Sequence, residues 1–307
     1  MDGDTIHVLR GGERAKLRLL SVDTEEKLTG RSFTPEKPET VYGEETALWA
    51  QEFFAELAGE DEPPRVGLLF PDGEEAFDIY GRLLCHVLLP DGTDFNLHLV
   101  RTGRSPYFNK YGHSRVCHGA FVEAQERARA ERLGIWNPAT NAAATPDAPE
   151  VRRPYARLMP WWQCRADAID AFRERSAAEP EAYAAADWPA DLERAVESGR
   201  PVDVFGALHA LFDEEDGSLT LLFRYGDRER ALRARVAPEH RAAFTHLELP
   251  HRMDAYRQNY LYARGIIRPG PEPYGGYEMW LEEAGDLRLA GAEPRVPTGS
   301  PPGLAGR

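Results

Sequence analysis

The chain has 307 residues, which is enough for two domains, and 42% of them are apolar, so each domain can bury a core. The net charge of −14 argues against a protein that coats nucleic acid through a broad basic surface, so any such contact has to be local. Three scattered cysteines support neither a disulfide framework nor a zinc site, and no apolar run is long enough for a membrane span.

Five short strands are predicted in the first half of the chain, because apolar and polar residues alternate there. The first two strands flank Gly11 and Gly12, which accept the positive φ of a hairpin turn. In the second strand, Arg18 lies on the polar face, opposite Leu17 and Leu19. The five segments are residues 5–9, 15–20, 66–70, 82–89 and a short piece near Phe95-Asn96-Leu97.

Two helices accompany these strands. Apolar residues recur at helical spacing over residues 44–58 and again over residues 120–132, and each segment is followed by a glycine. A small five-stranded antiparallel β-barrel with helices packed on it, the OB fold of the α+β class, fits this order of elements. Residues 27–41 are predicted to form a mobile loop, and residues 1–137 to form the first domain.

The second half has a different organisation. Residues 138–154 have the alanine- and proline-rich composition of a linker, and residues 291–307 that of a disordered tail. Between them, residues 155–290 are predicted to begin with a helix, to continue as a loose Ala/Glu-rich region up to Ser198, and to form a second OB-like barrel. Its five strands are residues 202–211, 219–225, 231–236, 260–268 and 277–281.

Carboxylates and single arginines gather in three short segments of the first half, Asp2-Gly3-Asp4-Thr5, residues 18–26 and residues 78–82. Carboxylate oxygens bind hard cations, and guanidinium groups bind phosphate oxygens through two parallel hydrogen bonds. The mixture therefore predicts a site that holds a cation beside a phosphodiester. Taken alone, Asp2 and Asp4 also suit a solvated turn.

In order and spacing, these segments resemble the thermonuclease family, whose domains are similar to staphylococcal nuclease. The resemblance covers residues 1–137; the second half shows none. The matching fragments are Asp2-Gly3-Asp4-Thr5, Arg18-Leu19-Leu20, Val22-Asp23-Thr24, Glu26, Tyr42-Gly43 with Glu45, Tyr80-Gly81-Arg82, Asn96 with Leu99-Val100-Arg101 and Gly103, and Gly134-Ile135-Trp136.

The resemblance implies a calcium site. Asp4 and Asp23 would be the direct ligands of Ca²⁺, with the backbone carbonyl of Thr24 and water completing the shell, and Asp2 would lie close enough to tune the charge. Glu45 is implied to be structural, through hydrogen bonds to loop backbone.

The resemblance also implies catalytic residues. Glu26 would orient or deprotonate the attacking water, and the sequence leaves open which of the two it does. Arg18 and Arg82 would hold the phosphate and stabilise the negative charge of the five-coordinate transition state. The alternative for Arg18 is an ordinary surface arginine on a half-exposed strand.

Substrate contacts are expected from a short list of aromatic and basic residues. Tyr80 would reach a neighbouring phosphate, Tyr107 or Tyr111 would stack on a base, and Lys110 would add a phosphate contact. The alternative is that these tyrosines belong to the core, as aromatic residues beside a barrel often do.

Three departures from the family pattern stand out. Met1 directly precedes Asp2, so we expect either that translation starts upstream or that this copy lacks the strand that normally leads into the motif. Glu25 replaces the usual proline, which adds a negative charge and predicts tighter calcium binding and poorer phosphate approach. Ile79 stands where a basic residue often grips a terminal phosphate.

The expected function is a calcium-dependent nuclease that cleaves single-stranded or denatured DNA and RNA with little sequence preference and, by resemblance, leaves 3′-phosphates. One alternative is a weakly active or inactive nuclease fold that binds nucleic acid or protein; another is a binding protein whose second barrel carries the function. The expected compartment is the cytoplasm for the chain as given, or the exterior if translation starts upstream. No membrane contact is expected, and the partner of the second domain is left open.

Overall fold

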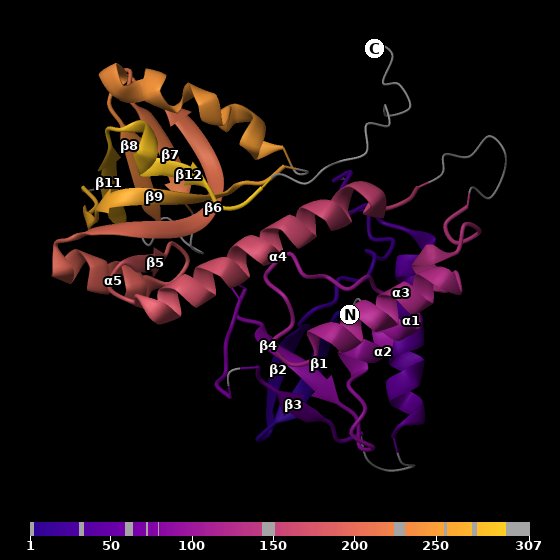
Figure 1. Cartoon of the computed structure of the whole chain (residues 1–307). Coiled ribbons are helices and arrows are strands. Elements are labelled where there is room, and N and C mark those ends of the chain that lie inside the picture. The colour runs from indigo at the N-terminus through magenta and orange to yellow at the C-terminus, as the bar shows by residue number, and fades with distance from the viewer. Residues whose placement is uncertain are drawn as a thin grey trace. The chain divides into compact units, whose positions relative to one another are not determined.

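The structure is a computed structural model, and it forms two compact units, Met1–Tyr155 and Ala156–Arg307 (Figure 1). None of the helices described is both long and apolar enough to cross a membrane. The structure describes residues 3–30, 34–58, 64–71, 73–78, 80–142, 151–223, 231–254, 257–271 and 275–292.

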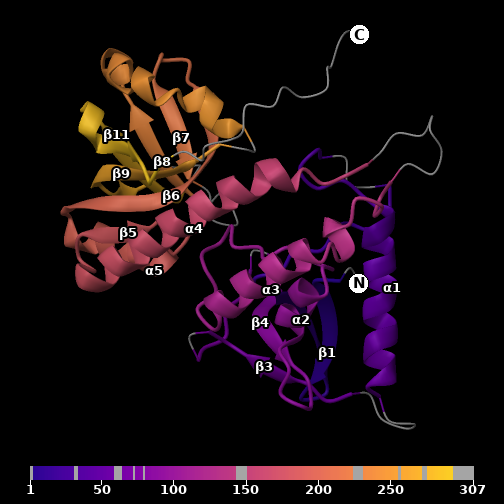
Figure 2. The ribbon, with the colours of Figure 1, turned by 45° about the vertical axis from the view of Figure 1, so that its right-hand side comes forward.

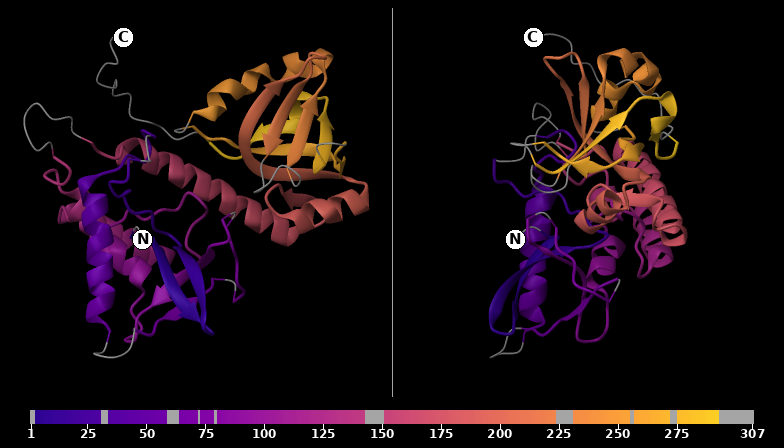
Figure 3. Two further views of the ribbon diagram at one scale, coloured as in Figure 1. Left: turned by 180° about the vertical axis from the view of Figure 1, so that it is seen from behind. Right: turned by 90° about the vertical axis from the view of Figure 1, so that its left-hand side faces the viewer.

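The first unit is built on a four-stranded sheet in the order β1-β2-β4-β3. Strands β1 and β2 form the predicted hairpin, which Figure 3 shows from behind, with Arg10 paired to Glu13 across the two glycines. Strand β4 is parallel to β2 and antiparallel to β3. The strands span Thr5–Arg10 (β1), Glu13–Leu19 (β2), Gly67–Leu69 (β3) and Leu83–Leu88 (β4).

The described residues of this unit include three α-helices, of which α2 and α3 lie side by side (Figures 1 and 2). The segment near Phe95 that was predicted as a strand is the first turn of α2. The carboxylate of Asp94 accepts hydrogen bonds from the backbone nitrogens of Asn96 and Leu97, and this N-cap makes the helix the favoured structure. The helices are α1 (Val41–Glu56), α2 (Phe95–Arg101) and α3 (His118–Ala130), followed by the 3₁₀ turn η1 (Gly134–Trp136).

The predicted fifth strand is therefore wrong, and the described residues form an α+β unit whose sheet does not close into a barrel. Asn96 is nevertheless central to the sheet. Its side-chain amide, which is fully buried, donates to the carbonyl oxygens of Leu20 (2.9 Å) and Cys85 (3.1 Å) and accepts from the nitrogen of Val87 (3.2 Å). These bonds hold α2 to β4 and to the residue that follows β2.

Cys85 lies in the core of the first unit, and burial raises the pKa of its thiol to about 12. We therefore expect Cys85 in the native protein to resist iodoacetamide at pH 8 and to react only after urea is added, as read by mass spectrometry. Because an unfolded thiol ionises near pH ~8.5, the stability that Cys85 contributes is full below that pH and is lost as the pH rises toward 12. Labelling of the native thiol would contradict this assignment.

The second unit contains the five strands predicted for it, and the sheet that they form is strongly curved in both views of Figure 3. The Ala/Glu-rich region that was predicted to be loose instead contains a strand and an amphipathic helix, which Gly199 ends in a left-handed conformation. The elements are α4 (Tyr155–Ala178), β5 (Tyr183–Ala185), α5 (Pro189–Ser198), β6 (Pro201–Asp213), β7 (Leu219–Phe223), β8 (Leu232–Val236), η3 (Pro238–Leu247), η4 (Leu249–Met253), β9 (Tyr260–Ile266), β10 (Arg268–Pro269), β11 (Tyr277–Leu281), η5 (Ala284–Asp286) and β12 (Leu287–Leu289).

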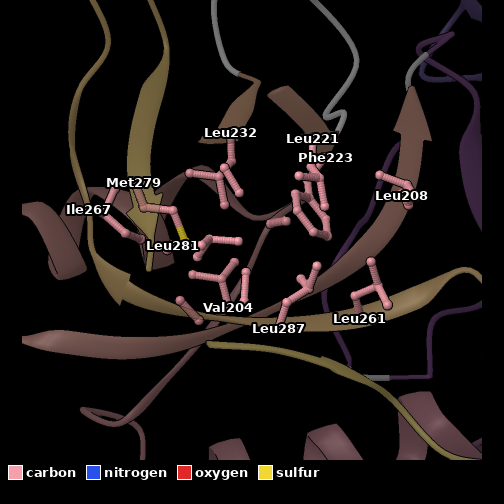
Figure 4. Packing of buried hydrophobic residues seen from close by; sticks show 14 of the residues in the cluster. Val204, Leu208, Leu221, Phe223, Leu232, Leu261, Ile267, Met279, Leu281 and Leu287 are labelled. Carbon is pink, nitrogen blue, oxygen red and sulfur yellow. The ribbon is translucent and has the colours of Figure 1, made fainter. Parts of the chain in front are cut away.

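The sheet of the second unit runs in the order β10-β11-β8-β7-β6-β9-β12, with β5 added to β6. Strand β8 is antiparallel to β7 and parallel to β11, and β6 pairs with both β7 and β9. The apolar faces of these strands enclose one core, in which residues such as Leu221, Phe223 and Leu281 point toward one another (Figure 4). No hydrogen-bonded ladder closes the sheet among the described residues, so the predicted second barrel is not established.

Candidate active site

The centre of the candidate site is a tight turn after β2. Leu17 and Leu19 are buried, which leaves Arg18 on the opposite face, as predicted. Ser21 has φ of 64°, a left-handed conformation that reverses the chain. As a result, Nη1 of Arg18 donates to the carbonyl oxygens of Leu19 and Val22, both at 2.9 Å. The turn therefore fixes the guanidinium beside the residues that follow it.

Two buried carboxylates lie against this guanidinium. Nη2 of Arg18 lies 2.9 Å from Oδ1 of Asp23, and Nη1 lies 3.4 Å from Oδ2 of Asp4. The backbone nitrogen of Thr24 donates to the same Oδ2 of Asp4 at 3.2 Å, and the backbone nitrogen of Asp23 donates to Oγ of Ser105 at 2.9 Å. The structure thus brings together Asp4, Arg18, Asp23 and Thr24.

Arg82 joins this group through a hydroxyl. Its Nη1 lies 3.4 Å from Oγ1 of Thr5, and that hydroxyl donates to Oδ1 of Asp4 at 3.1 Å. The guanidinium is held in place by Asp78, whose Oδ2 lies 2.6 Å from Nε. Because Oδ1 of Asp78 also accepts from the backbone nitrogens of Tyr80 and Arg82, the carboxylate organises the loop as well as the side chain.

Two cations that the sequence did not indicate also reach the carboxylates. Nζ of Lys37 lies 3.1 Å from Oδ1 of Asp23 and forms an ion pair with Glu26. Arg153 is buried and forms an ion pair with Oδ2 of Asp23. Lys37 belongs to the predicted loop 27–41 and Arg153 to the predicted linker, so composition gave no signal for either. The residues 138–142 and 151–154 of that linker lie within the first unit.

The ionisation of these groups follows from their pairing. Burial by itself opposes ionisation of Asp23, but Arg153, Lys37 and Arg18 together hold the pKa of its carboxyl well below the usual range. Burial likewise opposes the charge on Lys37 and Arg153, and their carboxylate partners raise both pKa values above the ordinary ones. Asp23, Lys37 and Arg153 are therefore charged at neutral pH.

Glu25 turns away from this cluster. Its buried carboxylate accepts from Oγ1 of Thr40 (2.6 Å), Nδ2 of Asn141 (2.7 Å) and the hydroxyl of Tyr155 (3.1 Å). Thr40 is the N-cap of α1, where it accepts from the nitrogen of Gly43 at 3.0 Å. The additional charge of Glu25, expected to bear on calcium and phosphate, instead ties the start of α1 to the end of the first unit.

Close packing at α1 explains the glycine of the Tyr42-Gly43 fragment. A Cβ on Gly43 would lie 2.1 Å from the carbonyl oxygen of Glu26, which is closer than any side chain can come. The backbone of Glu26 therefore packs directly against the first turn of α1, which fixes the point from which the Glu26 side chain extends.

We expect Glu25→Ala to lower the free energy of unfolding of the first unit by about 2–4 kcal/mol, because the buried hydroxyls of Thr40 and Tyr155 and the half-buried amide of Asn141 all lose their acceptor. Native-state hydrogen exchange of the β4 amides measures this quantity. Glu126→Ala, at an exposed position of α3, is the matched control and should change it by less than ~0.5 kcal/mol. Equal effects of the two substitutions would show that Glu25 is not a structural link.

The aromatic candidates differ in their exposure. Tyr80 is 75% exposed and lies 5.4 Å from the guanidinium carbon of Arg82, measured from its ring centroid. Tyr111 is 63% exposed, and Nζ of Lys110 lies 5.8 Å from its ring centroid. Tyr107, in contrast, is 3% exposed and its ring stacks on Phe121 in the core, so it offers no face to a base. Of the two alternatives for stacking, Tyr111 has the exposed ring.

The oxygen donors of the site are of the kind that a hard cation requires. Asp2 and Ile79 lie outside the described residues. The oxygens of Asp4 and Asp23 are of the kind that Ca²⁺ binds, and Oγ1 of Thr24 is buried there without a hydrogen-bond partner. The chemistry fits, but in the described structure Asp23 is bonded to cations of the chain, and no three acidic, histidine or cysteine residues converge as an open metal cage.

Sequence comparisons identify the family of the first unit. A family model described as staphylococcal nuclease homologue matches residues 16–138. The thermonuclease of Staphylococcus intermedius is 30% identical over 138 residues, which cover 44% of this chain and 71% of that protein. The chain therefore belongs to the staphylococcal nuclease family, and membership implies an OB fold for the first unit. The second unit lies outside the match.

Other relatives carry related names. Endonuclease YhcR of Bacillus subtilis is 29% identical over 141 residues, and an uncharacterized endonuclease of Escherichia coli is 27% identical over 139 residues. Each alignment covers 45% of this chain; it covers 74% of the Escherichia coli protein but 11% of YhcR. The similarity thus concerns one domain, and the activity of the whole chain is addressed as a proposal.

Proposed function

We propose that this protein is a calcium-dependent nuclease that hydrolyses phosphodiester bonds of single-stranded or denatured DNA and of RNA, with little sequence preference, and leaves 3′-phosphates. Membership in the staphylococcal nuclease family supports the reaction class. The observation that carries the proposal is the connected network of charged groups in the first unit.

That network links residues far apart in the chain. Starting from Arg82, it passes through Thr5 to Asp4, then to Arg18 and Asp23, and Lys37 connects Asp23 to Glu26. Carboxylates for a cation and guanidinium groups for a phosphate thus lie within one hydrogen-bonded cluster. Their mutual pairing also preorganises the arginines, which is the condition under which charge stabilises a transition state most.

Each residue has a proposed task. Arg18 and Arg82 bind the phosphate oxygens and stabilise the negative charge that develops as water attacks phosphorus in line and the 5′ oxygen leaves. Glu26 orients the water or accepts its proton, since its carboxylate is partly exposed at the edge of the cluster. Asp4, Asp23 and the carbonyl of Thr24 hold Ca²⁺, which when bound supplies Lewis-acid polarisation of the phosphate.

Substrate binding is proposed to be local and weak. With a net charge of −14, the surface repels a polyanion, so affinity has to come from the site itself and from a few neighbours. Tyr80 offers a contact beside Arg82, Tyr111 offers an exposed ring for stacking, and Lys110 adds a positive charge next to it. Stacking without base-edge contacts predicts tolerance of sequence and a preference for unpaired strands.

The second candidate is a nuclease fold that binds nucleic acid or protein without cleaving it. The observation that favours it is the saturation of Asp23 by Arg18, Lys37 and Arg153, which leaves the carboxylate neutralised by the chain itself. The presence of all the acidic and basic residues implied by the family favours the enzyme.

For the second unit, we propose an OB-like domain within residues 155–290, and for the first a nuclease domain within residues 1–137. The proposal is supported by the order β11-β8-β7-β6-β9, with a parallel β8–β11 pair and 3₁₀ segments between β8 and β9. A mixed sheet of this kind provides a curved surface for a strand of nucleic acid or a protein partner. A purely structural role is the alternative.

The decisive experiment incubates the full chain with denatured DNA in the presence of calcium, and in parallel with a calcium chelator. We expect fragments ending in 3′-phosphate with calcium and no cleavage with the chelator. Cleavage that persists in the chelator would refute the metal dependence. Binding without cleavage in both arms would establish the binding module.

A further inference from the structure

Arg153 makes more contacts with Asp23 than an ordinary surface ion pair provides. It is 7% exposed, lies two residues before α4, and belongs to the first unit. Its Nη1 donates to the backbone carbonyl oxygen of Asp23 at 3.0 Å, its Nη2 pairs with Oδ2 of the same residue, and its Nε donates to the carbonyl oxygen of Glu36 at 3.0 Å. One guanidinium therefore engages both the side chain and the main chain of the residue proposed to bind calcium.

Both carboxylate oxygens of Asp23 are occupied in this arrangement. Oδ1 lies 2.9 Å from Arg18 and 3.1 Å from Lys37, and Oδ2 pairs with Arg153. A divalent cation needs a carboxylate oxygen within direct bonding distance, and it repels a guanidinium held at the same oxygen. Loading the site with a metal thus requires a cation of the chain to withdraw from Asp23.

Of the three cations, Arg153 is the one whose withdrawal would free a carboxylate oxygen of Asp23 completely. Arg18 is also anchored by the carbonyl oxygens of Leu19 and Val22, within the turn that forms the site, and it is needed for the phosphate. Lys37 shares its charge between Asp23 and Glu26 and leaves Oδ2 untouched. Arg153 covers Oδ2, and it lies outside the stretch that matches the nuclease family.

We propose that Arg153 is an intramolecular competitor of the divalent cation for Asp23, and that it sets the calcium concentration at which this site loads. The inference rests on the proposed calcium site. Metal-free protein holds Arg153 on Asp23, and calcium binds the fraction of molecules in which the guanidinium has left. The apparent affinity for calcium is lowered by that fraction, so removing the competitor raises it.

The test is calorimetric titration of the full-length protein with calcium chloride. Arg153→Gln keeps much of the side-chain volume and part of the hydrogen bonding but removes the charge. We expect this variant to bind calcium at least about 10-fold more tightly than the parent chain. A competitor that occupies Asp23 in nine molecules of ten would have that effect when it is removed. Arg153→Lys, which keeps the charge but not the bidentate grip, should lie between the two. The control is Arg152→Gln, at the exposed neighbouring arginine, and it should leave the affinity unchanged.

A second measurement guards against misfolding of the variants, because it uses the parent chain alone. Saturating calcium should accelerate hydrogen exchange in peptides that contain Arg153 and Tyr155, since their contacts with Asp23 and Glu25 loosen when the guanidinium leaves. Unchanged hydrogen exchange in the calcium-saturated parent chain would overturn the proposal. Calcium binding by Arg153→Gln that is equal to or weaker than that of the parent chain would also overturn it, and so would a failure of both proteins to bind calcium. Tighter binding without any cleavage of DNA would uphold the competition and refute the nuclease instead.

Discussion

Replacing Arg82 with alanine is expected to lower the turnover of denatured DNA by about 100- to 1,000-fold, the usual loss when one preorganised donor to a transition-state charge is removed. The side chain is 21% exposed and is aligned by Asp78, so it meets the substrate in a fixed orientation. Its loss should raise KM far less than it lowers turnover, because most of the charge that it stabilises develops after binding. Steady-state cleavage kinetics at saturating calcium measure both constants.

Arg14→Ala is the matched control for this substitution. Arg14 is an exposed arginine of β2, outside the network, and its removal should leave turnover within about twofold of the parent value. Because Asp78 keeps its hydrogen bonds to the nitrogens of Tyr80 and Arg82, the Arg82 variant should remain folded. A rise in KM with unchanged turnover would assign Arg82 to substrate affinity alone.

A second large effect is expected on the stability of the first unit when the charge of Asp23 is removed. Asp23→Asn should lower the free energy of unfolding of the first unit by about 3–5 kcal/mol, because three cations, two of them largely buried, would lose the charge that offsets their burial. The amide has nearly the same shape as the carboxylate, so packing is preserved and the loss is electrostatic. Hydrogen exchange of the β4 amides reports on this unit by itself.

Asp91→Asn provides the control for the change from acid to amide. Asp91 is exposed and accepts from the nitrogen of Thr93 at 2.9 Å, a bond that an asparagine oxygen also makes, so little change is expected. If Asp23→Asn is as stable as the parent, the ion pairs around Asp23 contribute no net stability, and Arg153 is then not held firmly enough to compete with a metal. The same variant should lose calcium binding, which calorimetry detects independently of stability.

Both predictions bear on the choice between an enzyme and a binding module. A module that only binds nucleic acid needs the arginines but not a loaded metal site, so Arg82→Ala would weaken its binding while calcium would have no effect. An enzyme whose metal site fills only when Arg153 withdraws needs both the arginines and bound calcium. Asp23 is paired with Lys37 and Arg153, so the effect of calcium on this site distinguishes the two functions by experiment.

Local features of the fold were predictable because their causes are local. The alternation of residues 15–20 placed Arg18 opposite the core, and the two glycines after Arg10 produced the hairpin. The same reasoning found all five main strands of the second unit. It failed near Phe95, where three residues resembled a strand but the N-cap of Asp94 started a helix, a competition that alternation alone does not register.

The sequence by itself determined the family of the first domain and the residue types of its site, since these are written in short motifs that keep their order and spacing. Only the tertiary structure decided which charges meet. Arg153 lies 130 residues from Asp23, Tyr155 lies 130 residues from Glu25, and Tyr107 turned its ring into the core rather than toward solvent. Periodicity encodes the backbone and the buried face of one element, whereas the partner of a charged side chain is chosen by the packing of distant segments and by the need to neutralise charge wherever burial makes it costly.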